Sequence, residues 1–486
     1  MLLPMPTRFP ARGLVAILAA SVLGACAPLP PHPELMAPLQ VPAAWSARAG
    51  GGSAGSTSLT EWWRRFSDPT LNTLVAQAIQ AHTSIALAQA ALQQARASRD
   101  GAAAALSPSL SGSASAQRAR SAGATNNRFN AGLDASWELD LFGGRRSGVD
   151  AGDATVRASL ASLGDAQVSI AAEVGLSYIT LRSSQARLAI ATRNLASQQE
   201  TLQITRWRQQ AGLVSALETE QALGAVEQTR AQLPNLQTAI DQTRHALAVL
   251  TGQPPASPLP LLQAAAPVPV PPVGLALAVP AETLRQRADV RAAEHQITAA
   301  LAQVAQADAA RLPSFRLGGS LGLNALTLGS LTNGASLAAA VLASVSLPLF
   351  DGGAARAQVQ VQQATLDQAR VRYRAAVLTA LQDVEDALVA LQGDTDRLQN
   401  LQAAATAAGN AAELARQRYS SGLIDFQTVL ETQRTELATQ DNVATGTAAI
   451  SSDQVRLYKA LGGGWVPDTA AIATDSAPRP TRTPAP

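Results

Sequence analysis

Few residues in this chain of 486 could perform covalent or metal chemistry. Cys26 is the only cysteine, so a disulfide framework is excluded. The only lysine, Lys459, is followed by Ala460, which excludes a Gly-Lys-Ser/Thr phosphate loop. The 4 histidines are scattered, with no His-Glu-x-x-His motif and no second thiol for zinc. We therefore expect no enzyme, no metal site and no cofactor.

The residues before Cys26 predict a processed leader. Arg8 and Arg12 precede an apolar run over 13–24, and small residues follow it. This order is typical of a secretory signal peptide, here 1–25. The run is too short to span a bilayer, which takes about 20 apolar residues.

Leu23-Gly24-Ala25-Cys26 resembles a bacterial lipobox. The resemblance implies cleavage before Cys26, attachment of a diacylglycerol to its sulfur, and acylation such as palmitoylation of the new N-terminus. Several acyl chains would anchor the protein stably. Residues 26–67 would then form a lipidated, proline-rich N-terminal extension. The alternative is a leader that contains a cysteine by chance.

The charge of the chain gives no sign of a nucleic-acid partner. Loss of Arg8 and Arg12 leaves 37 − 2 = 35 cationic residues against 35 acidic ones, a net charge of zero. Arginines and acids are interspersed, without the clustered basic patch that phosphate backbones require.

Proline placement predicts long helices. Residues 109–233 and 349–465 contain no proline and are rich in Ala, Leu, Gln, Arg and Glu, which are strong helix formers. Leucines recur every seven residues from Leu181 to Leu202, as in coiled coils. The expected long helices are 146–211, 215–251, 353–420 and 425–461. The first would be about 100 Å long, which suits a spanning device better than a compact domain.

The chain is also duplicated. Ala211-Gly212-Leu213 matches Ser421-Gly422-Leu423 at an offset of 210, and Pro108-Ser109-Leu110 matches Pro313-Ser314-Phe315 at 205. We expect a first repeat over 68–252, a proline-rich linker over 253–280 and a second repeat over 281–463. Each repeat would open with one helix. Residues 464–486 would form a disordered tail.

Inside each repeat the apolar period changes from 3.6 to 2, which predicts strands. The expected strands are 109–121, 127–140, 314–327 and 336–348, with turns at Gly123 to Asn127 and at Asn333-Gly334. Soluble hairpins would give the same pattern, but the secretory leader favours tilted membrane strands of about 10 residues. Four strands cannot close a conducting barrel, and an open edge in lipid is too costly. Several chains must therefore contribute to one barrel.

Three motifs now resemble those of the TolC-type outer-membrane channels, in their lipoprotein branch that serves resistance-nodulation-division (RND) efflux pumps. The motifs are Trp62-Trp63-Arg64-Arg65-Phe66-Ser67-Asp68-Pro69-Thr70-Leu71, Trp137-Glu138-Leu139-Asp140-Leu141-Phe142-Gly143-Gly144-Arg145 and Leu347-Pro348-Leu349-Phe350-Asp351-Gly352-Gly353. The resemblance implies a mixed membrane α/β fold. It would be a homotrimer with a 12-stranded β-barrel, four strands per chain, continued by an α-helical periplasmic tunnel.

The resemblance also implies roles for particular residues. Phe142, Gly143, Gly144, Phe350, Gly352 and Gly353 would form the strand-to-helix junctions, where glycine permits a sharp turn. Gly212, Leu213, Gly422 and Leu423 would lie at helix-hairpin tips that dock a periplasmic adaptor. Gln427, Thr428, Glu431 and Arg434 would line the periplasmic aperture. The family places acids at the position of Thr428 or Glu431, so a second acidic ring is left open here.

The function implied is a passive exit duct in the outer membrane, held by its lipid anchor and opened by an adaptor and an inner-membrane RND transporter. The alternatives are a periplasmic adaptor lipoprotein, which predicts a single hairpin flanked by β-rich modules, a structural coiled-coil protein and a secreted enzyme. The exported substrate does not follow from the sequence.

Overall fold

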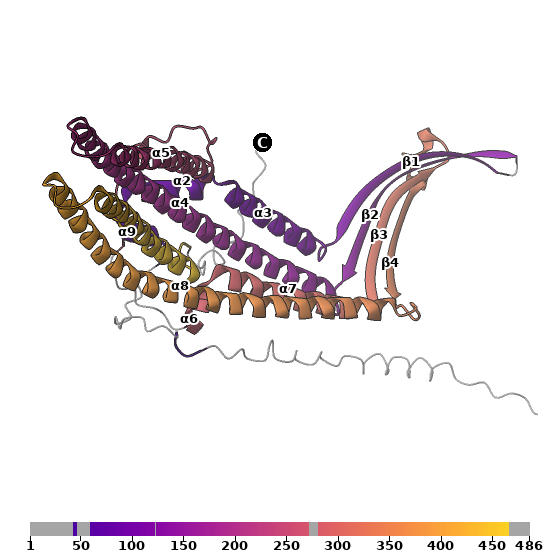
Figure 1. Cartoon of the computed structure of the whole chain (residues 1–486). Coiled ribbons are helices and arrows are strands. Elements are labelled where there is room, and N and C mark those ends of the chain that lie inside the picture. Colours follow the sequence, from indigo (N-terminus) through magenta and orange to yellow (C-terminus); the bar gives the residue numbers. More distant parts are fainter. Residues whose placement is uncertain (1–41, 46–58, 122, 272–279, 466–486) are drawn as a thin grey trace, which may run out of the picture. The chain divides into compact units, whose positions relative to one another are not determined.

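The computed structural model describes residues 42–45, 59–121, 123–271 and 280–465. The expected signal peptide, Cys26 and nearly all of the expected tail lie outside these ranges. Within them the chain forms helices, two strands and a long helical hairpin, and then repeats that order (Figure 1).

The four strands form one antiparallel sheet in the order β1-β2-β3-β4. The strands are β1 (Ser109–Ser121), β2 (Ala124–Leu139), β3 (Ser314–Ala325) and β4 (Leu337–Ser346). The central pair, β2 and β3, joins the two repeats with Trp137 opposite Leu317. β1 and β4 each pair on one side only within the described chain, so the sheet has two open edges.

The two strand connections differ from the expected turns. β2 already begins at Ala124, three residues before the expected 127, and Gly123 with φ 83° makes the reversal. A positive φ of this kind favours glycine. Between β3 and β4, Asn333-Gly334 is not a two-residue turn but part of a longer connection, which contains the short helices Leu328–Ser330 and Gly334–Ser336.

The helices have matching lengths in the two repeats. α4 and α8 each have 67 residues, and α5 and α9 each have 35. At about 1.5 Å per residue, the longer ones extend about 100 Å. The helices are α2 (Pro69–Ala81), α3 (Thr83–Ala104), α4 (Gly144–Gln210), α5 (Ala216–Leu250), α6 (Pro280–Gln286), α7 (Ala288–Ala309), α8 (Ala354–Ser420) and α9 (Phe426–Ala460).

Each repeat opens with two helices, where a single helix was expected. The chain is extended at His82 (ψ 134°) and at Arg287 (ψ 129°), which separate α2 from α3 and α6 from α7. At each break a local side-chain contact holds the new helix. His82 Nδ1 accepts from the Ser84 N–H at 3.1 Å, and Arg287 pairs with Asp289 at 2.7 Å. The breaks lie 287 − 82 = 205 residues apart, so they are equivalent positions of the repeat.

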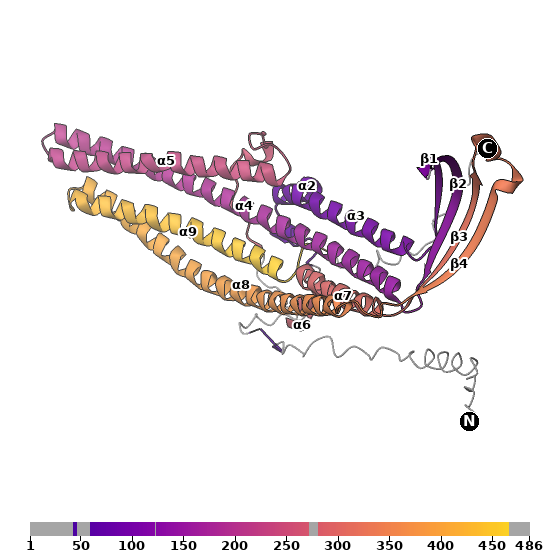
Figure 2. The ribbon, with the colours of Figure 1, turned by 90° about the vertical axis from the view of Figure 1, so that its right-hand side faces the viewer.

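α4 is the central helix of the described chain. It packs against α2, α3, α5, α7 and α9, whereas α8 packs mainly against α7 and α9 (Figure 2). Glycines permit the closest approaches to α4. A Cβ on Gly164 would lie 2.5 Å from the Trp465 ring, and one on Gly175 would lie 2.9 Å from the Trp62 ring. Such distances are far below van der Waals contact, so these positions require glycine.

An aromatic cluster closes the core around the middle of α4. The rings of Trp62 and Tyr458 stack with centroids 5.4 Å apart, and Trp63 and Phe66 meet Trp62 edge-on. The cluster joins the segment before α2 to the end of α9. Four of the 17 aromatic residues of the chain therefore lie at one place.

Part of the proline-rich linker, residues 254–271, crosses the helices and is held through its backbone carbonyls; we call it the carbonyl strap. Arg182 donates to Ala264 O at 2.6 Å, Arg244 donates to Leu262 O at 3.2 Å, and the Ser451 hydroxyl donates to Pro269 O at 2.8 Å. The donors come from α4, α5 and α9, so the strap ties both hairpins together. None of the described helices has a stretch both long and apolar enough to cross a bilayer.

Candidate functional site

The two hairpins end in tips with the same backbone structure. The first tip is residues 211–215, between α4 and α5, and the second is residues 421–425, between α8 and α9. Gly212 (φ 72°) and Gly422 (φ 74°) take the left-handed conformation that ends a helix. The N–H of Leu213 donates to Arg208 O, and that of Leu423 to Arg418 O, at 2.8 and 2.9 Å. This hydrogen-bond pattern is the Schellman motif, which explains the glycine in each tip.

The side chains on the tips are exposed but differ in polarity. Leu213 and Leu423 are 68% and 73% exposed. The first tip adds the exposed Trp207 and Leu217, and the equivalent positions near the second tip, 210 residues later, are the polar Gln417 and Gln427. The first tip is therefore the more apolar of the two.

The residues expected at the aperture share one exposed face of α9. Gln427, Thr428, Glu431 and Arg434 are all exposed, while Val429, Leu430 and Gln433 are buried against the neighbouring helices. Glu431 and Arg434 form no ion pair with each other in the described chain. Both charges are therefore available to groups outside this chain.

Thr428 has a local role that its sequence position did not suggest. Its N–H and its hydroxyl both donate to Asp425 Oδ1, at 2.8 and 2.6 Å. Asp425 thereby caps the N-terminus of α9. These two hydrogen bonds depress the pKa of Asp425 below its ordinary value. An acid at 428 could not donate in this way once ionised, so the cap accounts for threonine here.

The two tips are tied together by contacts that the sequence analysis did not anticipate. Arg208, on α4, donates to Tyr419 O at 2.7 Å and stacks over the Tyr419 ring at 4.4 Å. The Tyr419 hydroxyl donates to Glu218 Oε2, on α5, at 3.2 Å. Burial raises the pKa of Tyr419, so its hydroxyl remains a donor at neutral pH. No local pattern could have revealed these contacts, because they join residues more than two hundred positions apart.

Polar contacts continue along α4 and α9 away from the tips. The Gln433 amide donates to Thr201 Oγ1 at 3.0 Å, and the Asn194 amide donates to Gln440 Oε1 at 3.0 Å. Arg187 donates to Asp441 through two hydrogen bonds of 2.6 and 3.1 Å. A cavity of about 640 Å³ lies beside the Arg187–Asp441 pair and also contacts Arg434. The cavity lining is mostly polar, and these hydrogen bonds add to a buried apolar cluster that also joins the two hairpins, in which Leu202 of α4 packs with Tyr419 of α8 and Phe426 of α9.

The first strand-to-helix junction is fixed by side chains. Asp140 accepts hydrogen bonds from the N–H groups of Arg145 and Arg146 at 3.1 and 2.8 Å, and so caps α4. Arg145 returns to β2, where it pairs with Glu138 at 2.7 Å. Gly143 has φ 75°, which favours glycine. A Cβ on Gly144 would lie 2.9 Å from that of Ala309, so Gly144 lets α4 approach α7.

The phenylalanine of the second junction is far more exposed to solvent than that of the first. Phe350 is 94% exposed, whereas its counterpart Phe142 is 37% exposed and its ring lies 6.4 Å from that of Phe315. Asp351 caps α8 by accepting from the N–H groups of Gly353 and Ala355, both at 2.8 Å. Gly352 and Gly353 both have positive φ, 64° and 92°. Both junctions thus place a left-handed glycine, Gly143 or Gly353, directly before the helix, but the second adds a further left-handed glycine and the capping acids stand at different positions.

The described residues contain no cluster of His, Cys, Asp and Glu side chains suited to hold a metal ion. Cys26 lies outside them, so the expected lipid site has no structural description.

Comparison with known proteins agrees with this architecture. A family model described as "Outer membrane efflux protein" matches residues 74–253 and 279–463, one match in each repeat. The outer membrane protein OprJ of Pseudomonas aeruginosa is 32% identical, over 94% of this chain and 97% of OprJ. The pyoverdine export outer membrane protein OpmQ of the same species is 32% identical, over 95% of this chain and 99% of OpmQ.

A solved structure of the outer-membrane channel OprN superposes with a TM-score of 0.81 at 33% identity, covering 89% of this chain and 99% of that one. The adaptor alternative predicted a single hairpin, whereas the described chain has two, with the strands between them and the opening helices. Its repeats, its four-stranded sheet and these relatives agree: the chain belongs to the outer membrane efflux protein family and is an outer-membrane efflux channel.

Proposed function

We propose that three copies of this chain form a passive, non-catalytic exit duct of a tripartite pump. The observation that carries the proposal is the four-stranded sheet with two open edges, β1 and β4. Unpaired backbone groups in lipid cost several kcal/mol each, so β1 of one copy must pair with β4 of the next. Three copies of four strands give a closed barrel of 12 strands, wide enough to conduct.

The oligomer can be tested on the full-length protein extracted from outer membranes in mild detergent. A trimeric barrel migrates as a compact species on a gel when unheated and as a single chain after boiling, lighter than the 50.0 kDa of the uncleaved sequence. Chemical cross-linking of the unheated sample should end at three chains. A heat-independent monomer band, or cross-linking that ends at another number, contradicts the proposal.

We further propose that the duct is gated at its tips. The contacts of Tyr419 with Arg208 and Glu218 hold the second hairpin against the first, which supports a closed arrangement. A periplasmic adaptor that docks on Gly212, Leu213, Gly422 and Leu423 would open the duct if it binds the separated hairpins more tightly. An inner-membrane RND transporter would supply the energy and select the cargo.

Glu431 gives this gate its charge selectivity. Three copies of its exposed carboxylate around a narrow axis attract cations and repel anions. In planar bilayers, Glu431→Ala should lower the ratio of cation to anion permeability, and Arg434→Ala should change the closed-state conductance. Glu220→Ala, an exposed acid near the first tip, is the control. Unchanged selectivity in Glu431→Ala contradicts the assignment.

The membrane anchor is proposed at Cys26, since the sole cysteine falls at the end of the lipobox-like sequence. Cells that express Cys26→Ser should incorporate no radiolabelled palmitate into the protein, while the wild type is labelled. Label that persists in the variant shows that the acylated residue is not Cys26.

A further inference from the structure

The seam between α8 and α9 has apolar contacts on both sides of the buried Asp453. On one side of it, Leu388 of α8 packs with Leu457 and Leu461 of α9 in a buried cluster. On the other side, a Cβ on Gly446 of α9 would lie 3.3 Å from the side chains of Leu398 and Leu401. An aspartate between two such contacts is costly unless its charge is compensated.

The compensation of Asp453 is incomplete. Its side chain is 2% exposed, and its Oδ1 accepts from Arg456 Nη1 at 2.7 Å. Its Oδ2 is buried and has no hydrogen-bond partner in the part of the chain that the structure describes. The carboxyl group of Asp394, on α8, lies close enough to interact with that of Asp453 by charge and by a side-chain hydrogen bond. Burial, with the charge of Asp394 adding to it, raises the pKa of Asp453.

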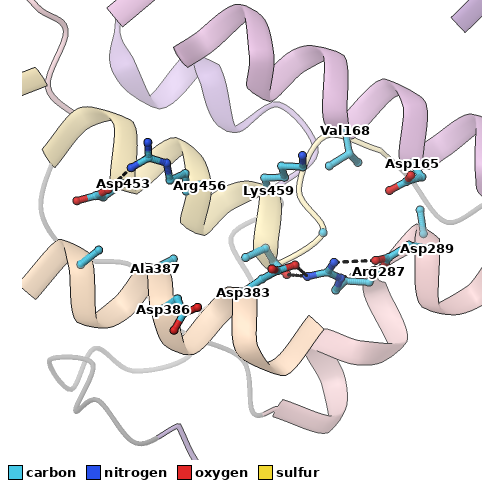
Figure 3. A pocket seen from close by; sticks show the side chains of 14 residues that line it. Asp165, Val168, Arg287, Asp289, Asp383, Asp386, Ala387, Asp453, Arg456 and Lys459 are labelled. Carbon is cyan, nitrogen blue, oxygen red and sulfur yellow. Dashed lines mark hydrogen bonds and ion pairs between the residues drawn. The ribbon is translucent and has the colours of Figure 1, made fainter. Parts of the chain in front are cut away.

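The neighbouring cations do not neutralise both acids. Arg456 and Arg397, the ion-pair partners of Asp453 and Asp394, are 59% and 57% exposed, so water screens much of their charge. Arg287, in the adjoining cavity of about 390 Å³, is already paired with Asp289 and Asp383 (Figure 3). The other charged residues of that cavity are Asp165, Asp386 and Lys459.

We propose that Asp394 and Asp453 share one proton across the α8–α9 seam, so that the packing of the second hairpin depends on pH. We call these two residues the carboxyl pair. The proton comes from solvent and changes the charge of the pair from −2 to −1. The protonated carboxyl then donates to the carboxylate opposite, which gives the buried Oδ2 the hydrogen-bond partner that it lacks as long as both groups are ionised.

The direction of the pH effect follows from proton linkage. The folded protein holds this proton at pH values where the unfolded chain, whose aspartates titrate near 3.8, has released it. The stabilisation is therefore complete below that value and is lost as the pH rises through the raised pKa. The contribution of the carboxyl pair to the packing of the second hairpin is therefore largest in acid and is lost as the pH rises through the raised pKa. This holds whether or not the chain forms the proposed duct.

Thermal unfolding of the full-length protein in detergent, between about pH 4 and about pH 8, tests the proposal. Asp453→Asn should raise the Tm at neutral pH by a few degrees, and the gain should disappear in acid. Asp394→Asn should act in the same direction, and the double variant should gain much less than the sum, because either change removes the repulsion. Asp386→Asn removes an exposed charge from the same cavity and is the matched control.

A pH-independent gain in Tm, or additive gains in the double variant, contradicts a shared proton. A second measurement uses the wild type alone and does not depend on the variants folding. Amide exchange, corrected for intrinsic rates, should become faster around Asp394 and Asp453 as the pH rises, relative to equivalent positions of α4 and α5. Equal corrected rates in acid and at neutral pH overturn the proposal.

Discussion

The two helical hairpins have the same length and different surroundings. α4 and α8 both have 67 residues, yet α4 is covered on most sides and α8 is largely open. Leu181 of α4 is fully buried, and its counterpart 210 residues later, Leu391 of α8, is partly exposed. Duplication has preserved length and periodicity, while the neighbouring elements decide which side chains are buried. The first hairpin is therefore the more enclosed of the two, and the second leaves more of its surface exposed.

The tips differ in the same way. Their backbones match, but Asp425 caps α9 with its side chain, while Ser215, at the start of α5, makes no such bond. Arg208 donates a hydrogen bond to Tyr419 O of the second hairpin, whereas its counterpart Arg418 is exposed. Each difference gives a pair of substitutions at equivalent positions, and each pair tests whether the two copies have separate roles.

The largest effect is expected in the cores of the hairpins. Leu181→Ala should destabilise the protein by about 2–5 kcal/mol, the usual cost of truncating a buried leucine, and Leu391→Ala by clearly less. Thermal unfolding in detergent measures both. Val174 and Val384 are equivalent and both fully buried, so Val→Ala there should cost similar amounts. Equal losses at Leu181 and Leu391 would remove the contrast between the hairpins.

An intermediate effect is expected between the tips. Arg208→Ala removes a hydrogen bond and a cation–π contact with Tyr419, worth about 1–3 kcal/mol together, and should increase the conductance of the reconstituted channel. Arg418→Ala removes an exposed side chain and should leave conductance unchanged. If the two variants behave alike, the Arg208 contact does not hold the tips together.

The smallest effect is expected at the caps. Asp425→Ala should increase amide exchange in the first turn of α9, and Ser215→Ala should change the first turn of α5 very little. Because the folded pKa of Asp425 is depressed, its contribution is present above its ordinary value of 3.8 and is lost as the pH falls through the depressed value. A difference between Asp425→Ala and wild type that persists in strong acid would indicate a role other than capping by the carboxylate.

Much of the fold could be predicted from the sequence because its signals are local and occur twice. Proline-free stretches and heptad leucines mark the long helices, and alternating residues mark the strands. The breaks at His82 and Arg287 were missed because neither residue is a glycine or proline that would mark a helix end. Their 205-residue spacing was the available signal, since it matches the offset seen at Pro108 and Pro313.

The candidate sites were less predictable. Most glycines of the tips and junctions could be identified because a left-handed turn restricts residue type, while Gly144 is required by the close approach of α4 to α7. The Arg208–Tyr419–Glu218 contacts and the carboxyl pair depend on which helices become neighbours, and periodicity does not contain that information. Thr428 was assigned to the aperture from its position in the sequence, but its hydroxyl donates to the Asp425 carboxylate and takes part in the N-terminal cap of α9.

The carbonyl strap has a consequence for how the two repeats stay in register. Proline has no N–H, and 7 of the 18 residues in this segment are proline, so the segment has few donors of its own and is held through its carbonyl groups. Its carbonyl groups accept hydrogen bonds from one donor on each of three helices, α4, α5 and α9. The strap therefore fixes the axial position of the two hairpins relative to each other. If one hairpin slid past the other, the hydrogen bonds to Arg182, Arg244 or Ser451 would break.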